Sequence, residues 1–285
     1  MYSLLISAQE LQKLQHDAAK LVVFDCSFDL SRPDAADGLF ADLHIAGALQ
    51  AHLDRDLSTK DPQQAVNGGR HPLPRREVVA AWLGRMGVDN ATQVVVYDRN
   101  GCHYCGRLWW MLKWLGHDAV AVLDGGLQAW QVAGGATETG PAKPHSPATF
   151  MLREPLRQLV STDTVALGLG QTSQTVIDAR AAARYRGDVE PLDPVAGHIP
   201  GALNRPFTDN FRSDGRFKNA DELRSEWQGL LGARDAETVV HHCGSGVTAV
   251  PNLLAMELAG YGPTALYAGS WSEWCRTPGL PCTKG

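Results

Sequence analysis

The chain has 285 residues and a formal net charge of −5, a length that suits two domains better than one ordinary core. The negative charge excludes a dominant basic surface, so nucleic acid is not an expected partner. No stretch approaches the roughly 18 apolar residues of a membrane span, and the first residues lack the charged and apolar regions of a signal peptide. The six cysteines are scattered and do not resemble a disulfide framework. We therefore expect a soluble, cytoplasmic protein with reduced thiols.

Four short patterns occur twice along the chain, once in each half. They are a strand ending at an aspartate (Val22–Asp25 and Val176–Asp178), a His-Ile-x-Gly-Ala turn (His44–Ala48 and His198–Ala202), a β-branched run (Val94–Arg99 and Thr238–Cys243) and a segment ending in tryptophan (Leu123–Trp130 and Tyr267–Trp274). Such repetition indicates two copies of one structural unit. Because His44 and His198 recur at the same turn, we expect both to have a structural hydrogen-bonding role.

Each half alternates short β-branched runs with longer helical patterns. The helices are predicted over residues 77–84, 108–115, 220–231 and 250–259. This alternation favours an α/β fold of two tandem domains, each a mostly parallel sheet flanked by helices. The proline-rich stretch 141–150 is predicted to link an N-terminal domain, 1–140, to a C-terminal domain, 151–285.

Two cysteines of the first half, Cys102 and Cys105, have the spacing of a redox motif. They lack the usual surroundings of a thioredoxin-like site, so a structural pair is expected and a regulatory disulfide is the alternative. The repeat places Arg99 opposite Cys243 of the second half. The first half is therefore expected to lack a nucleophile and to act as a structural, substrate-shaping domain.

A candidate nucleophile site lies in the second half, where an apolar strand stops at Cys243 and a glycine-rich turn leads into a helix. Backbone N–H groups of such a turn and the positive end of the helix stabilise a thiolate, which is the nucleophilic form of cysteine. Ligands bind beyond the carboxyl ends of strands in sheets of this kind. Pro251 is tolerated only in a first helical turn, so the helix is expected to begin no earlier than about Val247. A buried structural cysteine is the alternative.

Together these motifs resemble the tandem rhodanese-type sulfurtransferases over nearly the whole chain. The loop Cys243–Thr248 is similar to that of the 3-mercaptopyruvate sulfurtransferases, because thiosulfate-preferring members usually have basic residues directly after the cysteine. The resemblance implies that Cys243 takes sulfur from 3-mercaptopyruvate as a persulfide, releases pyruvate and passes the sulfur to cyanide or a thiol such as thioredoxin. It implies no metal, no organic cofactor, and neither nucleic acid nor membrane as a partner.

The resemblance also implies a group of residues that assist Cys243. Ser245 would polarise the substrate, with His71 as the base and Asp56 orienting the imidazole. Arg184 matches the family arginine that holds the substrate carboxylate. The other substrate-binding residues implied are those of the loop: Gly244, Gly246, Val247 and Thr248.

One position departs from the family pattern on the anion-binding side of the site. Members often have a second arginine shortly after a Glu-Pro pair, whereas Glu190-Pro191 is followed here by Leu192. Arg186 is the candidate to replace that arginine. The departure weakens the choice of 3-mercaptopyruvate over thiosulfate as the donor.

Three other functions compete with this interpretation. A thiosulfate:cyanide sulfurtransferase would use the same cysteine with another donor. A non-catalytic sulfur-binding or interaction module would be expected to lose Cys243, as the first half has lost its nucleophile. A phosphatase with a rhodanese-like fold needs an arginine six residues after the cysteine, where this chain has Ala249.

Overall fold

The computed structural model describes residues 1–17 and 20–285. The chain forms two compact units. The first comprises Met1–Gln64, Pro74–Leu156 and Ser213–Arg216, and the second comprises Ala65–Leu73, Arg157–Arg212 and Phe217–Gly285. The segment 65–73 thus belongs to the second unit, although its neighbours in sequence on both sides belong to the first. None of the helices in the described part of the chain combines the length and the apolar character that a membrane span requires.

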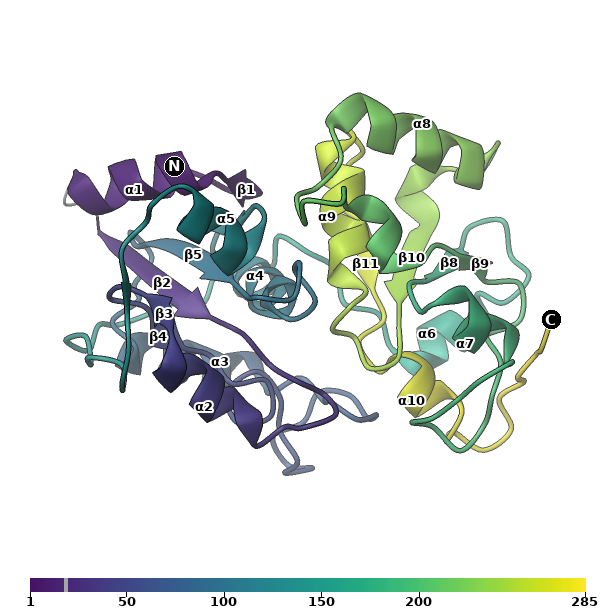
Figure 1. Ribbon diagram of the computed structural model, residues 1–285. Helices are drawn as coiled ribbons and strands as arrows, with labels where there is room; N and C mark the ends of the chain where they lie inside the picture. Colours follow the sequence, from purple (N-terminus) through teal and green to yellow (C-terminus); the bar gives the residue numbers. More distant parts are fainter. Residues whose placement is uncertain (18–19) are drawn as a thin grey trace. The chain divides into compact units, whose positions relative to one another are not determined.

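The first unit is built on a five-stranded parallel sheet (Figure 1). Its strands lie in the order β1 (Leu5–Ile6), β6 (Val120–Leu123), β5 (Gln93–Tyr97), β2 (Leu21–Asp25) and β4 (Leu49–Gln50). The helices of this unit are α1 (Ala8–His16), α2 (Ala35–Asp42), α3 (Arg76–Arg85), α4 (Cys105–Trp114) and α5 (Gly126–Val132). A short antiparallel pair joins β3 (His44–Ile45) to β7 (Thr137–Glu138).

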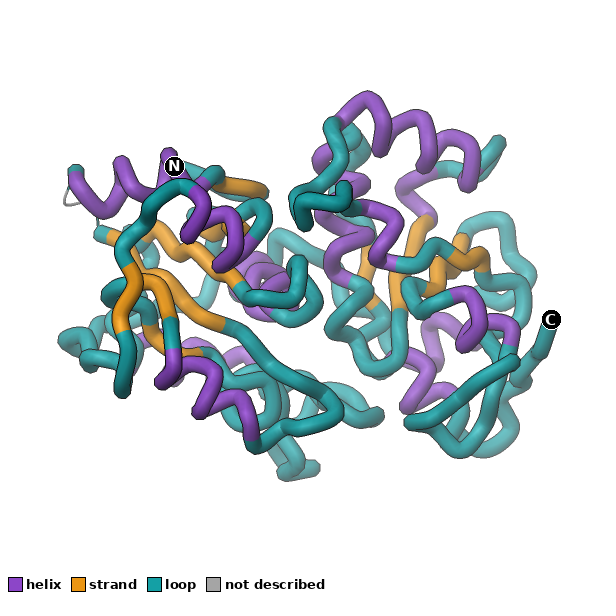
Figure 2. The backbone as a smooth tube through the Cα atoms, viewed as in Figure 1, coloured by secondary structure: helices purple, strands orange, loops and turns teal. Residues whose placement is uncertain are grey.

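The second unit repeats this plan with a four-stranded parallel sheet. Its order is β11 (Ala265–Leu266), β10 (Val239–His242), β8 (Thr175–Asp178) and β9 (Leu203–Asn204). The helices are α6 (Thr162–Leu167), α7 (Ala182–Arg186), α8 (Ala220–Leu231), α9 (Val250–Leu258) and α10 (Ser270–Trp274), with 3-10 turns at η1 (Phe207–Asn210) and η2 (Ala236–Thr238). Figure 2 shows the strands of each unit gathered between its helices.

Strand β10 shows why helices cover both faces of the second sheet. Successive side chains of a strand point to opposite faces. Val240 joins the buried cluster that contains Val165 of α6 and Trp271 of α10. His241, the next residue, packs instead against Trp227 of α8 and has its Nε2 3.3 Å from the Met256 sulfur of α9. Because helices pack against both faces of the sheet, the strand is buried along its whole length.

The predicted helices are confirmed, and their ends follow local signals. The helix predicted over 220–231 has the same bounds in the structure, where the Asn219 side chain caps it by accepting the Glu222 N–H. Helix α9 begins at Val250 with Pro251 in its first turn, as predicted. The fold class of two mostly parallel sheets flanked by helices is confirmed as well.

The two turn histidines make the same contacts in both units, which confirms their structural role. His44 stacks on Phe40 with ring centroids 3.9 Å apart, and its Nδ1 contacts the Phe40 carbonyl oxygen at 2.8 Å. His198 stacks on Tyr185 at the same 3.9 Å, with Nδ1 at 2.9 Å from the Tyr185 carbonyl oxygen. Each ring therefore ties its turn to a preceding helix.

Candidate active site

Cys243 lies immediately after β10, at the carboxyl end of the parallel sheet, and its residue is 1% exposed. Its backbone is fixed to the start of α10 by two hydrogen bonds. The Cys243 N–H donates to the Ser270 Oγ at 3.1 Å, and the Trp271 N–H donates to the Cys243 carbonyl oxygen at 3.0 Å. The loop that follows, residues 243–249, leads directly into α9. The strand, cysteine, loop and helix predicted from the sequence are therefore all present.

Gly246 gives this loop its shape. Its φ is +72°, a conformation that side chains disfavour, and a Cβ built there would lie 2.3 Å from the Ala268 carbonyl oxygen. Gly246 thus allows the backbone of Ala268 to approach the loop closely. Ser245 and Val247, on either side of the glycine, are buried, while Thr248 is partly exposed. The loop is therefore tightly packed.

His71 reaches this loop from the segment 65–73. The His71 Nδ1 lies 2.7 Å from the Ser245 Oγ, and both residues are buried. The structure treats the two predicted partners of His71, Ser245 and Asp56, differently. Ser245 is in direct contact with His71. Asp56 lies in the first unit, where its carboxylate accepts the His52 N–H at 2.8 Å and burial raises the pKa of its carboxyl group. An orienting role of Asp56 toward His71 stays a prediction.

Hydrogen bonds to α10 hold the segment 65–73 in place. The Gly68 N–H donates to the Glu273 Oε1 at 3.0 Å, and the Arg70 N–H donates to the Ser272 Oγ at 2.9 Å. Ser272 in turn donates its own N–H to the Gly244 carbonyl oxygen at 2.9 Å. The start of α10 is thus bonded both to the cysteine loop and to the segment that presents His71.

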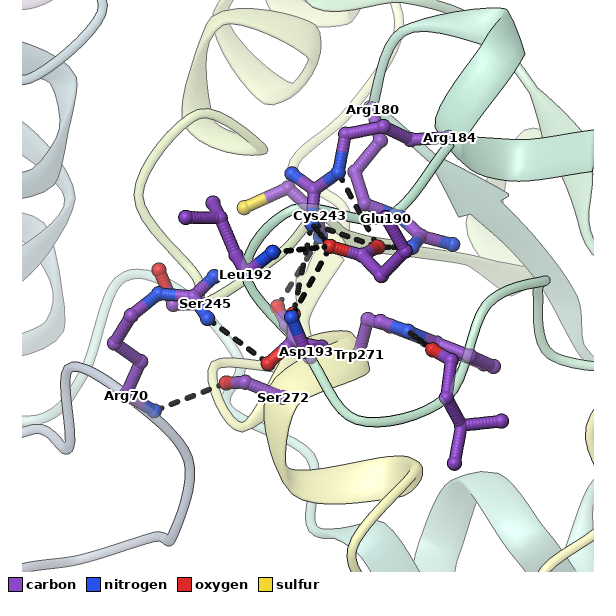
Figure 3. A network of polar contacts seen from close by, with 12 residues as sticks. Arg70, Arg180, Arg184, Glu190, Leu192, Asp193, Cys243, Ser245, Trp271 and Ser272 are labelled. Carbon is purple, nitrogen blue, oxygen red and sulfur yellow. Dashed lines mark hydrogen bonds and ion pairs between the residues drawn. The ribbon is translucent and has the colours of Figure 1, made fainter. Parts of the chain in front are cut away.

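Arg184 lies beside the same loop and is held by two acidic residues (Figure 3). Its Nη2 lies 2.7 Å from the Glu190 Oε1 and 3.5 Å from the Asp193 Oδ2. Arg180 shares Glu190 at 3.3 Å and contacts Asp178 at 2.6 Å. Because the carboxylates of all three acids are buried, they fix the direction of both guanidinium groups.

Of the two positions considered for a second arginine beside the loop, 192 is uncharged and 186 forms a half-exposed ion pair. The Leu192 side chain carries no charge, and its N–H donates to the Glu190 Oε1 at 3.1 Å. Arg186 pairs with Asp188 at 2.7 Å, with about half of each side chain exposed. The structure places a different residue there, Arg70, which the sequence did not single out. The one local signal was its position next to His71.

The histidines that precede Cys243 face away from each other, as the strand period predicts. His242 lies 3.6 Å from Asp178 and its Nδ1 is 3.1 Å from the Cys243 carbonyl oxygen. His241 lies on the opposite face, where burial lowers its pKa to about 3. Within the described part of the chain, no group of three or more histidine, cysteine, aspartate or glutamate side chains is arranged to hold a metal ion.

The structure corrects the residue of the first unit that corresponds to Cys243. Asp25 pairs with Tyr97 between β2 and β5, and Asp178 pairs with His242 between β8 and β10. Tyr97 therefore corresponds to His242, and the next residue, Asp98, corresponds to Cys243. The prediction of Arg99 was wrong by one residue, because a run of β-branched residues has no internal landmark and its register is set by the partner strand.

The Asp98 carboxylate fills the loop of the first unit. It accepts the N–H groups of four residues, Asn100, Cys102, Tyr104 and Cys105, at 2.8 to 3.0 Å. Cys102 and Cys105 are buried free thiols, and burial raises the pKa of the Cys105 thiol. This unit therefore has an internal carboxylate where the second unit has a cysteine.

Comparisons with known proteins agree with this duplicated arrangement. A family model described as "Rhodanese-like domain" matches residues 7–133 and 161–277. A probable 3-mercaptopyruvate sulfurtransferase of Pseudomonas aeruginosa is 43% identical over 98% of this chain and 100% of its own. A putative thiosulfate sulfurtransferase of Mycobacterium tuberculosis is 36% identical over 99% and 97% of the two chains. The structure of a 3-mercaptopyruvate sulfurtransferase from Leishmania major superposes with a TM-score of 0.83 at 31% identity, covering 98% of this chain and 76% of that one.

Proposed function

Because the chain belongs to the rhodanese-like family of sulfurtransferases, we propose that it takes sulfur from 3-mercaptopyruvate onto Cys243 and passes it to a thiol or to cyanide, releasing pyruvate. One observation supports this donor above all. The residue two positions after the cysteine is a serine whose hydroxyl contacts a buried histidine at 2.7 Å. The thiol of 3-mercaptopyruvate must lose its proton and its carbonyl must be polarised, whereas thiosulfate has neither a thiol nor a carbonyl group.

The chemistry of the first half-reaction balances without an external oxidant. The Cys243 thiolate attacks the sulfur of 3-mercaptopyruvate and forms an S–S bond. The C–S bond breaks, and its electron pair goes to the carbon, which leaves as the enolate of pyruvate and then takes up a proton. Sulfur is oxidised from the thiol to the sulfane level, and the carbon is reduced. An acceptor thiol or cyanide then removes the outer sulfur and restores Cys243.

Ser245 and His71 act on the reacting part of the donor in this proposal. The Ser245 hydroxyl donates a hydrogen bond to the substrate carbonyl oxygen, on which negative charge develops as the enolate forms. The thiol proton passes by way of the Ser245 hydroxyl to the His71 Nδ1, and the resulting Nδ1–H donates to the Ser245 Oγ, which leaves the hydroxyl hydrogen for the substrate carbonyl. Asp56 is proposed to orient the His71 imidazole.

Arg184 holds the substrate carboxylate in this proposal, because its guanidinium lies beside the loop and is fixed by Glu190 and Asp193. A planar guanidinium matches a carboxylate with two parallel hydrogen bonds. The transferred sulfur, bound to Cys243, is proposed to lie against the backbone of the loop residues Gly244, Gly246, Val247 and Thr248. The scheme needs no metal and no organic cofactor.

The same scheme indicates the cellular compartment and the sulfur acceptor. We propose a cytoplasmic enzyme whose acceptor is a small thiol or a thioredoxin-like protein, since a thiolate nucleophile needs a reducing compartment. The proposed domains are 1–140 and 151–285 with a linker at 141–150. Matches of the family model at 7–133 and 161–277 fall inside these bounds, which supports them.

A side-by-side measurement of kcat/KM for 3-mercaptopyruvate and thiosulfate, each with cyanide and with a dithiol, tests the proposal. We expect 3-mercaptopyruvate to be the better donor with both acceptors. Incubation with this donor alone should add the mass of one sulfur atom to the protein, and Cys243→Ser should abolish both the adduct and turnover. A preference for thiosulfate would instead indicate a thiosulfate:cyanide sulfurtransferase. That alternative is the main competitor, because residue 192 is a leucine where family members that use 3-mercaptopyruvate often have an arginine. Turnover by the serine variant would contradict the persulfide mechanism.

A further inference from the structure

We infer that Arg70 is a second substrate-binding arginine, which together with Arg184 forms the clamp for the donor's carboxylate. This inference rests on the proposed function, since it names the group that recognises the carboxylate of the proposed donor. Within the family pattern that role would have fallen after Glu190-Pro191, where this chain has Leu192.

The geometry at Gly244 brings the two arginines together beside the nucleophile. A Cβ built on Gly244 would lie 3.0 Å from the Arg70 Nη2 and 3.5 Å from the Arg184 Nη1. Both guanidinium groups therefore point at one face of the residue that directly follows Cys243. Because Gly244 has no Cβ, both guanidinium groups can approach the backbone of the residue next to Cys243, the proposed nucleophile.

Asp193 fixes Arg70 without using its whole fork (Figure 3). The Arg70 Nη1 donates to the Asp193 Oδ1 at 2.9 Å, and this carboxylate is fully buried. The Nη2 is the atom directed at Gly244. The Arg70 side chain is 21% exposed and that of Arg184 20%, so both are accessible to a small anion.

The charges of this cluster favour an anionic ligand. Four arginines, 70, 180, 184 and 276, share the three buried carboxylates of Asp178, Glu190 and Asp193. One positive charge remains before Cys243 ionises. A second guanidinium adds further charge-assisted hydrogen bonds, because each carboxylate oxygen can accept more than one.

The backbone places Arg70 and His71 as a pair. The Arg70 N–H is bonded to the Ser272 Oγ at 2.9 Å, and the next side chain contacts Ser245 at 2.7 Å. A single short segment thus presents a cation to the substrate's carboxylate end and an imidazole to its reacting end. Through Arg70, the segment 65–73 in this way supplies the contact with the donor's carboxylate that Leu192 cannot make.

The test compares Arg70→Ala with a matched control, Arg276→Ala. Arg276 also contacts the Asp193 Oδ1 at 2.9 Å, but it is not among the atoms nearest to Gly244. Each variant is assayed with 3-mercaptopyruvate and with mercaptoacetone, a donor that has the same thiol and carbonyl but no carboxylate. For Arg70→Ala we expect KM for 3-mercaptopyruvate to rise about tenfold to a hundredfold, the range of one charge-assisted hydrogen bond. We expect kcat, and the kinetics with mercaptoacetone, to change little.

Two further variants make the interpretation specific. Arg70→Lys keeps the charge but loses the fork, so it should be intermediate. Leu192→Arg in the Arg70→Ala background should restore much of the lost affinity. Equal losses with both donors, or a similar loss in Arg276→Ala, would overturn the role of Arg70 and indicate only a structural ion pair. If the unaltered protein turns over neither 3-mercaptopyruvate nor mercaptoacetone, the proposed function fails instead, so the two failures are distinguishable.

Discussion

The His71 Nδ1 lies 2.7 Å from the Ser245 Oγ, although the two residues are 174 positions apart in the sequence. This contact joins the segment 65–73 to the loop that contains Cys243. It places the His71 imidazole against the hydroxyl of Ser245, which lies two residues after Cys243, the proposed nucleophile.

Replacing Ser245 with alanine should reduce turnover of 3-mercaptopyruvate more than turnover of thiosulfate. The hydroxyl is proposed to act on the carbonyl and thiol of the first donor, and thiosulfate has neither. Loss of general acid–base assistance typically costs about a hundredfold in rate or more. Kinetics of Ser245→Ala, His71→Asn and the double variant should show losses that do not add, since the two side chains act through one contact. Equal losses with both donors would remove Ser245 from a donor-specific role.

Replacing Gly246 with alanine should destabilise the cysteine loop. The φ of +72° costs an alanine about 1–2 kcal/mol, and its Cβ would meet the Ala268 carbonyl oxygen at 2.3 Å. Urea unfolding should therefore show a loss of about 2 kcal/mol or more in the free energy of unfolding. The matched control is Gly229→Ala inside α8, where a Cβ meets no atom within 4 Å. That variant should gain about 0.5–1 kcal/mol; a gain in both variants would contradict the proposed strain.

Replacing Asp98 with alanine should destabilise the first unit through its loop. The carboxylate accepts four backbone N–H groups, which alanine leaves without this acceptor. Losing charged hydrogen bonds of this kind costs about 3 kcal/mol or more in the free energy of unfolding. Asp98→Asn keeps one acceptor oxygen and should lose less. Unfolding curves of the two variants check this order, and an alanine variant as stable as the asparagine variant would refute it.

The stability of the protein should fall on acidification partly because of His241. Burial lowers the pKa of His241 to about 3 in the folded chain, from an ordinary value of 6.5. Between those values the unfolded chain binds a proton that the folded chain does not. The stabilising contribution is therefore complete above about pH 6.5 and declines by about 1.4 kcal/mol per pH unit down to about pH 3.

The variant His241→Phe should reduce that slope by about one proton. A phenyl ring can keep the edge contact with Trp227, where the ring centroids are now 5.7 Å apart. His242 adds a contribution of the same sign, since burial lowers its pKa too. Urea unfolding of both proteins between neutral pH and mild acid measures the difference. Identical slopes would show that His241 does not titrate on unfolding.

Several elements were predictable because their signals are local. The helix at 220–231 follows from its own capping residue and periodicity. The loop after Cys243 follows from its glycines, which are needed wherever the backbone takes a conformation such as that of Gly246. The start of α9 near Pro251 follows from the missing N–H of proline.

The register between the two halves was less accessible. Arg99 and Asp98 both follow a run of β-branched residues, and nothing within that run says which of them ends level with Cys243. Only the pairing of β5 with β2 decides it, through the partners Tyr97 and Asp25. Pairing depends on the neighbouring strand, which is distant in sequence.

The sequence by itself determined the α/β class, the internal duplication and the family resemblance, and it singled out Cys243 as the proposed nucleophile. These depend on periodicity, on short motifs and on a residue type in a recognisable loop. Only the tertiary structure decided that Arg70 lies beside the loop of the second unit, next to the predicted His71, and that Arg186 pairs with Asp188. The reason is that the segment 65–73 folds onto the start of α10 through hydrogen bonds to residues some 200 positions away. No local pattern records such contacts, because they join residues that are distant in the sequence.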